Sequence, residues 1–266
     1  MQLTSIHTNI MRIFLRNNFL NIIGLLKKPK PGVHIINAHF VTPDVYKKSD
    51  WDIFDDYLKY IQKSCKLISI QEATNTIFTN RFPTKDCLVA FTFDDGFFEC
   101  HSIIAPLLEK YNCNAAFFVC AKYIDSSSEY QNEFHGRIQT YNKRPMTWNN
   151  IIELHNRGHV IGSHTLDHVD MAKLSNDQMI YQLSENKKIL ESKLDYNCEY
   201  FAWTYGQFKH FPSIALKYSL KFHKYIFSAT NYKQYFSFQQ QVVNRRHIEP
   251  FWPKGHINYF LSVDKK

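Results

Sequence analysis

Short apolar runs that alternate with stretches of helical periodicity constrain the fold of this chain more than any other feature. The strand-like runs are 33–38, 67–70, 88–91, 115–119, 160–162, 201–203, 225–227 and 241–243, and the helix-like stretches are 51–64, 103–111, 147–157, 175–194 and 212–218. Strands separated by helices of this length predict parallel βαβ units and a barrel-like α/β domain without an internal linker. In such folds, chemistry is expected at the C-terminal ends of the strands.

Composition limits the classes of partner. The formal charge is +8, the pI is near 9.0, and 44% of the 266 residues are hydrophobic. The positive charge favours anionic partners such as a polysaccharide, a lipid-linked phosphate or a membrane surface. No basic cluster interleaved with aromatic residues is present, so we expect no nucleic acid partner. The six cysteines form no CxxC pair, which predicts reduced, buried thiols and a cytoplasmic protein.

We separate an N-terminal basic, amphipathic segment (1–32) from the remaining domain (33–266). The apolar stretch 9–26 is too short and too polar for a membrane-spanning helix, and no small-residue cleavage site follows it, so we expect no secretory signal. The segment instead predicts an amphipathic helix that lies either on an anionic membrane, at its inner face, or on its own domain. Its apolar positions are Ile10, Ile13, Phe14, Leu20 and Ile23.

Two short motifs carry the chemistry. Thr92-Phe93-Asp94-Asp95-Gly96 ends a buried strand, so it places two carboxylates before a glycine turn. Ser163-His164-Thr165-Leu166-Asp167-His168 places two imidazoles four residues apart, and both face one point if the segment is helical. One carboxylate and two imidazoles form a common ligand set for a catalytic Zn²⁺. The second carboxylate would be a base toward water, which predicts hydrolysis.

The ordered series of motifs resembles the polysaccharide deacetylases of carbohydrate esterase family four, the chitooligosaccharide deacetylase homology domain. The Thr-Phe-Asp-Asp-Gly segment is followed by His-Thr-x-x-His, and the similarity extends over about residues 33–250. The accompanying segments are 105–108, 115–119, Met146-Thr147-Trp148, 158–164 and 201–206. The resemblance implies a single domain with a distorted (β/α) barrel of about seven parallel strands.

The resemblance also implies roles for individual residues. Asp94 would be the general base, while Asp95, His164 and His168 would hold a divalent metal, most simply Zn²⁺. The backbone N–H of Tyr205 would stabilise the oxyanion, because the family has an aromatic-Pro-Tyr-Gly turn at this place.

The chain departs from the family pattern around these positions. The arginine that pairs with the base in many members is Ala202 here, and the usual proline is Thr204. Arg245 or Arg246 is the candidate replacement for that arginine, although a solvated basic pair is an equal alternative. We place Arg246 among the substrate-side residues.

The proton donor also lacks a clean match to the family's Leu-x-His. We choose His247 over His256 as the general acid, because His247 follows a strand-like run. His39 follows the first strand and is predicted to line the cleft, as is Trp203, for which a core position is the alternative.

We therefore predict a metal-dependent hydrolase that removes N-acetyl groups from amino sugars of a polysaccharide or its lipid-linked precursor. A cytoplasmic enzyme, bound peripherally at the inner membrane face, would fit the basic N-terminus. One alternative is a catalytically silent carbohydrate-binding protein of the same fold, suggested by the departures. Another is a hydrolase of a different non-peptide C–N bond.

Overall fold

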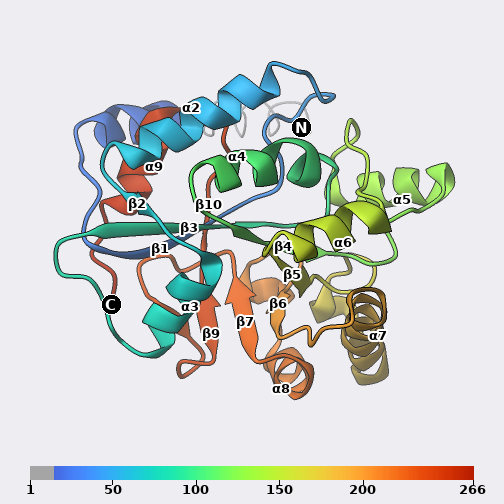
Figure 1. Ribbon diagram of the computed structural model, residues 1–266. Coiled ribbons are helices and arrows are strands. Elements are labelled where there is room, and N and C mark those ends of the chain that lie inside the picture. The colour runs from blue at the N-terminus through green and yellow to red at the C-terminus, as the bar shows by residue number, and fades with distance from the viewer. Residues whose placement is uncertain (1–14) are drawn as a thin grey trace, which may run out of the picture.

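A curled, mostly parallel sheet forms the centre of the computed structural model, which describes residues 15–266 (Figure 1). Its strands are β1 (Gly32–Ala38), β2 (Lys66–Leu67), β3 (Cys87–Phe93), β4 (Ala115–Val119), β5 (Val160–Ser163), β6 (Tyr200–Ala202), β7 (Tyr225–Ser228), β8 (Phe236–Ser237), β9 (Val242–Asn244) and β10 (Arg246–His247). The order is β10-β1-β3-β4-β5-β6-β7-β9-β8, with β2 beside β3. From β1 to β9 the neighbouring strands are parallel, which confirms the predicted single-domain distorted barrel.

The barrel closes through one continuous segment, residues 242–247. Its first half, β9, pairs with β7, and its second half, β10, pairs with β1, where Asn37 is in register with His247. Arg245 lies between these two strands, so it sits at the point where the segment changes partner. We call residues 242–247 the seam.

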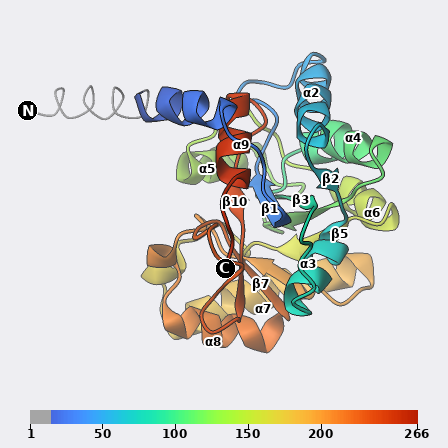
Figure 2. The same ribbon diagram turned by 90° about the vertical axis from the view of Figure 1, so that its left-hand side faces the viewer.

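Helices surround the sheet in the views of Figures 1 and 2. They are α2 (Asp50–Gln62), α3 (Ile70–Phe78), α4 (Ala105–Lys110, preceded by a π-helical turn at Cys100–Ile104), α5 (Ser128–Ile138), α6 (Trp148–Asn156), α7 (Asn176–Leu194), α8 (Ser213–Phe222) and α9 (Lys254–Leu261). Helices α6 and α7 begin with capping boxes at Thr147 and Ser175.

Helices α3, α5 and α9 are not among the elements predicted from the sequence. The predicted strand 67–70 ends at Leu67, and α3 begins at Ile70 because Ser69 caps it by accepting a hydrogen bond from the backbone N–H of Glu72. A serine followed three residues later by a glutamate is an N-cap signal. The short apolar run before that signal explains why the strand prediction extended too far.

Alternation along the strands decides which side chains lie inside the barrel. Val33 and Ile35 of β1, Ala90 of β3 and Val243 of β9 belong to one buried cluster, whereas Phe91 and Phe93 pack into a second cluster with α2 and α4. Because successive residues of a strand point to opposite faces, Thr92 and Asp94 continue the inner row of Ala90. The period of the strand therefore directs Asp94 to the barrel interior.

The N-terminal helix, described over 15–25, packs on α9 (Figure 2). A Cβ added at Gly24 would lie 1.7 Å from the carbonyl oxygen of Gly255, so only glycine allows this approach. Asn21 Oδ1 accepts a hydrogen bond from the Gly255 N–H at 3.0 Å. Ile10, Ile13 and Phe14 of the predicted amphipathic face lie outside the described residues. Within 15–266, no helix combines the length and apolar character needed to span a bilayer.

Candidate active site

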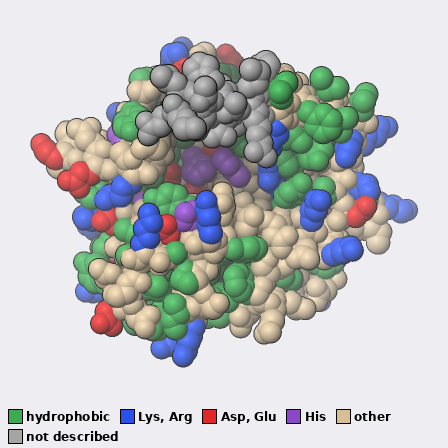
Figure 3. All heavy atoms as spheres, turned by 180° about the vertical axis from the view of Figure 1, so that it is seen from behind, with side chains coloured by type: hydrophobic (Ala, Val, Ile, Leu, Met, Phe, Trp, Pro, Cys, Tyr) green, Lys and Arg blue, Asp and Glu red, His purple; other side chains and the backbone are tan. Residues whose placement is uncertain are grey.

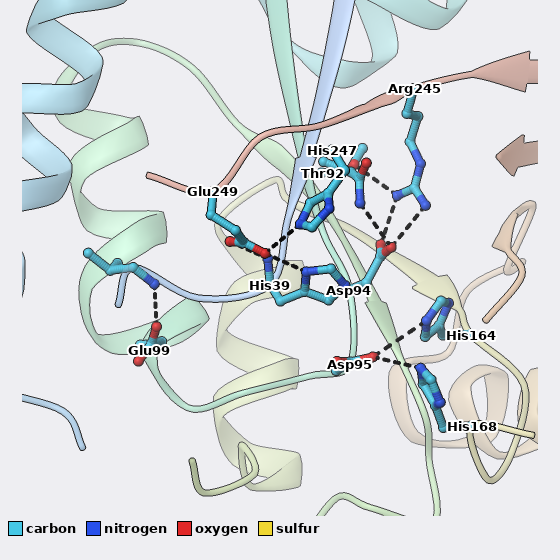
Figure 4. Close-up of polar contacts among 12 residues, drawn as sticks. His39, Thr92, Asp94, Asp95, Glu99, His164, His168, Arg245, His247 and Glu249 are labelled. Carbon is cyan, nitrogen blue, oxygen red and sulfur yellow. Dashed lines mark hydrogen bonds and ion pairs between the residues drawn. The ribbon is translucent and has the colours of Figure 1, made fainter. Parts of the chain in front are cut away.

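The predicted motifs meet at one edge of the barrel, where the parallel strands end. Asp94 and Asp95 follow β3, His164 follows β5, and His39 follows β1, while His247 ends β10. Figure 4 shows these side chains converging from separate strands. The edge is the C-terminal one for every strand, which is where catalytic groups of parallel α/β barrels are found.

Asp95, His164 and His168 form a buried triad. The Oδ1 atom of Asp95 lies 3.5 Å from His164 Nε2 and 3.2 Å from His168 Nε2, and one potential ligand atom from each residue lies within 4.8 Å of the others. All three residues are buried. Burial alone would raise the pKa of Asp95, but the two imidazoles hold that pKa well below its ordinary value.

Two strained residues bring His168 to the triad. The segment after His164 is not helical, contrary to the arrangement considered from the sequence, and Thr165 and His168 have φ values of +60° and +46°. A β-branched residue such as Thr165 rarely adopts this left-handed conformation. Such strain persists at sites where geometry has a function, because the surrounding structure must hold it in place.

The donor set fits a divalent cation. His164 Nδ1–H donates to the carbonyl oxygen of Ala202 at 2.7 Å, which leaves the lone pair of Nε2 toward Asp95. A metal-binding histidine is typically fixed in this way by a backbone carbonyl. Asp95 Oδ1 is buried and accepts no hydrogen bond from the residues described. A carboxylate oxygen without a donor, facing two imidazole nitrogens, is suited to Zn²⁺.

Asp94 is held by an arginine from the seam. Arg245 Nη1 donates to Asp94 Oδ1 at 2.7 Å, and Nη2 donates to Oδ2 at 2.9 Å. Arg245 is fully buried and also donates to Thr92 Oγ1 and to the carbonyl oxygen of Ser228. Burial would raise the pKa of Asp94, but this bidentate pair keeps the pKa below its ordinary value. Asp94 is therefore ionised and fixed in orientation.

Arg246 does not reach the site, which corrects its placement among the substrate-side residues. Its guanidinium lies 3.4 Å from the centroid of the Phe260 ring and 4.7 Å from that of Tyr232. Neighbouring residues of an extended segment point to opposite faces, so Arg245 turns inward and Arg246 turns toward α9. Burial lowers the pKa of Arg246 to about 10.

A second cluster joins His39 and His247 through Glu249. The Oε1 atom of Glu249 lies 2.6 Å from His39 Nδ1 and 2.7 Å from His247 Nε2, and Oε2 accepts the backbone N–H of His39 at 3.1 Å. Burial alone would lower the pKa of His39, but Glu249 raises it to about 9. The two imidazoles in turn lower the pKa of the buried Glu249 to about 2.

Both clusters open into one cavity of about 320 Å³. Figure 3 shows histidine side chains in a recess on this face of the molecule. The lining residues are His39, Phe40, Asp95, Ile138, Thr140, His168, Tyr205, His247, Glu249, Phe251 and Trp252. Tyr205 has a φ of +62°, and its ring centroid lies 4.8 Å from that of His168. The predicted oxyanion residue is thus at the cavity wall.

Trp203 is a core residue, which corrects its prediction as a substrate contact. Its side chain is fully buried and stacks on Phe211 with ring centroids 4.1 Å apart. Its indole N–H donates to the carbonyl oxygen of Gln207 at 3.2 Å. His256, the rejected alternative for the acid, lies 2.9 Å from the carbonyl oxygen of Asn17 and is also buried.

Glu249 is not among the site residues predicted from the sequence, and Arg245 and Arg246 stood as alternative partners of the base. A signal for both was present, because Arg245, His247 and Glu249 are spaced two residues apart. In an extended segment this spacing places all three side chains on one face. By this alternation, Arg245 and Arg246 are predicted to lie on opposite faces, whereas Glu249 is predicted to lie on the same face as His247.

The comparison with known families follows this geometry. The sequence model described as polysaccharide deacetylase matches residues 82–221, more than half of the chain, and this segment contains both the aspartate pair and the two histidines. The chain belongs to the polysaccharide deacetylase family. This confirms the resemblance seen in the sequence.

Two curated relatives are similar in sequence. The candidate polysaccharide deacetylase YxkH of Bacillus subtilis is 22% identical over 185 residues, which are 69% of this chain and 60% of the relative. The peptidoglycan-N-acetylglucosamine deacetylase of Bacillus cereus is 29% identical over 126 residues, which are 47% of this chain and 38% of the relative. The chain thus spans less than two thirds of either relative.

Solved structures support the fold. IcaB from Ammonifex degensii has a TM-score of 0.68 at 19% identity, and the match covers 89% of this chain and 99% of that structure. The deacetylase PplD of Streptococcus pyogenes, solved in complex with acetate, has a TM-score of 0.66 at 19% identity and covers 87% and 99%. The polysaccharide deacetylase barrel therefore accounts for most of this chain.

Proposed function

We propose that the protein is a metal-dependent hydrolase that removes N-acetyl groups from amino sugars of a polysaccharide or its lipid-linked precursor. One observation carries the proposal: Asp94 is ionised and oriented by Arg245 directly beside the buried triad of Asp95, His164 and His168. A base next to a cation site whose residues Asp95 and His168 line a cavity is an arrangement suited to amide hydrolysis by water. Family membership supports the same substrate class.

Each residue then has a defined task. A divalent cation in the triad would supply Lewis-acid chemistry toward the acetyl carbonyl and would acidify water. Asp94 accepts the proton of the attacking water, and Arg245 keeps its carboxylate aligned. The backbone N–H of Tyr205 donates to the oxygen that becomes negative. A protonated histidine gives its proton to the departing nitrogen, so acetate and a free amine leave.

His39 is the better supported proton donor of the two histidines bound to Glu249. It interacts electrostatically with both Asp94 and Asp95, and Glu249 keeps it protonated near neutral pH. His247, the residue chosen from the sequence, is turned toward Trp252, with ring centroids 4.9 Å apart. In this assignment Glu249 positions His39 and keeps it charged, while His247 holds the Glu249 carboxylate. His39→Gln should then stop turnover more completely than His247→Gln.

The pH profile tests the histidine assignment. A pKa of about 9 means that His39 loses its proton as pH rises through 9, so acetate release should decline on the alkaline side there. Glu249→Gln removes the main group that raises this pKa and leaves the burial that lowers it. The alkaline limb of kcat should therefore move to lower pH in Glu249→Gln. His247→Gln keeps the Glu249 carboxylate. If the alkaline limb of kcat moved as far in His247→Gln as in Glu249→Gln, the assignment of His39 would be contradicted.

Acetate release tests the function itself. The full chain, loaded with Zn²⁺, should release acetate from N-acetylated glycans such as chitooligosaccharides or peptidoglycan fragments, and a chelator should stop the reaction. Acetate release only from O-acetylated glycans would identify an ester as the substrate. Hydrolysis only of simple amides would identify a different non-peptide C–N bond. If the Zn²⁺-loaded protein binds these glycans but releases no acetate, the result supports the alternative, a catalytically silent carbohydrate-binding protein.

Cation binding can be measured without turnover. Because a ligand that binds only the native state stabilises it, Zn²⁺ at about a hundredfold excess over its Kd should raise the free energy of unfolding by about 2.7 kcal/mol. His164→Gln should lose this increase, whereas Asp55→Asn, which alters an ion pair between Asp55 on α2 and Lys110 on α4, should keep it. Equal stabilisation of wild type and His164→Gln would place the cation elsewhere.

A further inference from the structure

A stripe of large apolar side chains runs along the outer side of the N-terminal helix. Leu15, Phe19, Ile22 and Leu26 have exposed fractions of 60%, 61%, 62% and 82%. The spacing of Leu15, Phe19 and Ile22 places these three on one face of the helix, and Leu26 follows in the turn at its end. Among residues 15–266, such a run of exposed apolar side chains on one helix is unusual for a soluble surface and marks a binding face.

The opposite side of this helix is already packed. Leu20 and Gly24 are buried, and the Gly24–Gly255 contact and the Asn21 hydrogen bond attach the helix to α9. The helix is therefore anchored by one face while the apolar stripe points outward. Ile23, which the sequence analysis grouped with Leu20, is half-buried at the border between the two faces.

Basic residues accompany the stripe. Arg16 lies beside its first residue, and Lys27 and Lys28 directly follow its last, all three exposed. No acidic residue occurs between positions 15 and 28. Apolar side chains bordered by Lys and Arg complement an interface that combines acyl chains with anionic headgroups.

The N-terminal helix lies near the catalytic cavity. In Figure 3, hydrophobic and basic side chains occur together beside the recess with the histidines, on the side where Figures 1 and 2 place the N-terminal helix. Contacts connect the two regions: Trp252 lines the cavity, its ring centroid is 5.7 Å from that of His256, and His256 lies 2.9 Å from the Asn17 carbonyl oxygen.

We propose that the exposed face of the N-terminal helix, formed by Leu15, Phe19, Ile22 and Leu26 with Arg16, Lys27 and Lys28, docks the protein on an anionic lipid bilayer. The helix lies in the interface with its apolar stripe among the acyl chains, and the basic residues contact the headgroups. Docking in this orientation brings the cavity close to the membrane surface. The docking itself does not depend on the proposed deacetylation.

Sedimentation with vesicles tests the docking. The full chain should bind vesicles of equal parts phosphatidylglycerol and phosphatidylcholine, and bind phosphatidylcholine alone much more weakly. The double variant Phe19→Ser/Ile22→Ser should lower the partition coefficient by about tenfold or more, because two apolar side chains no longer enter the bilayer. Tyr181→Ser, which changes an equally exposed aromatic residue on α7, should bind as wild type.

Charge is tested separately. Lys27→Gln/Lys28→Gln should weaken binding to the anionic vesicles by about fivefold for each charge removed, and added salt should weaken wild-type binding. Lys188→Gln, a change at an exposed lysine of α7, is the control. The proposal would be overturned if the wild-type protein did not sediment with the anionic vesicles. It would also be overturned if the wild-type protein were a dimer in solution and Phe19→Ser/Ile22→Ser were a monomer, because the stripe would then be the contact between two copies.

Discussion

Asp94→Asn is expected to lower kcat for acetate release by about 10²–10⁴-fold, the usual contribution of a general base. The amide keeps the size of the side chain and its oxygen can still accept one hydrogen bond from Arg245, but it cannot take a proton from water. The triad of Asp95, His164 and His168 is unchanged, so stabilisation by Zn²⁺ should persist. KM should change little, because the missing proton transfer belongs to the transition state.

A matched control separates the loss of the base from the loss of a buried ion pair. Asp55 is also a largely buried aspartate with basic partners, since its carboxylate lies 2.9 Å from Lys110 Nζ and 2.6 Å from Lys59 Nζ. It lies on α2, away from the cavity. Asp55→Asn should lower stability while leaving kcat near the wild-type value. Substantial activity in Asp94→Asn would show that another group accepts the proton.

Arg245→Met should give the largest loss of stability. The substitution leaves the buried Asp94 carboxylate without its cation, and breaking a buried pair in this way costs about 3–5 kcal/mol of unfolding free energy. Activity should fall as well, because Asp94 loses both its orientation and the charge that keeps its pKa low. Chemical denaturation and acetate release measure the two effects. Arg245→Lys should recover only part of either, since an ammonium cannot form the bidentate contact.

Arg246→Met is the neighbouring control. Arg246 is packed against Phe260 and Tyr232, so its loss removes a cation–π contact but no partner of a buried carboxylate. Its effect on stability should be small and its effect on kcat negligible. A larger loss of activity in Arg246→Met than in Arg245→Met would contradict the assignment of the base's partner. The double variant Asp94→Asn/Arg245→Met should be less destabilised than the sum of the single changes.

The sequence predicted those parts of the fold and the candidate site that depend on local order. The parallel barrel follows from the alternation of elements, and the approach of Asp95, His164 and His168 follows from motifs at two strand ends. The local conformation was not predictable in the same way: His168 reaches Asp95 through left-handed residues, although the four-residue spacing had suggested a helix. Trp203 was placed in the cleft because aromatic side chains suit both a core and a cavity wall.

Long-range contacts account for the remaining differences. The family arginine is absent at Ala202, and the replacement comes from Arg245, more than 150 positions after Asp94 in the chain. No local pattern links these two residues, because only barrel closure brings them together. The Glu249 contact with His39 has the same origin, as 210 positions separate the two residues. Strand alternation would have identified the correct arginine, but the distance in sequence hid its partner.

The seam also sets the order in which function can arise during synthesis. Asp94 and the three triad residues all lie within the first 168 positions, whereas Arg245 and Glu249 are synthesised much later. In the proposed mechanism the base therefore gains its aligned partner, and His39 its carboxylate, only when the seam closes the barrel. A chain shortened before residue 242 should accordingly release no acetate, although it still contains the aspartate pair and the two histidines.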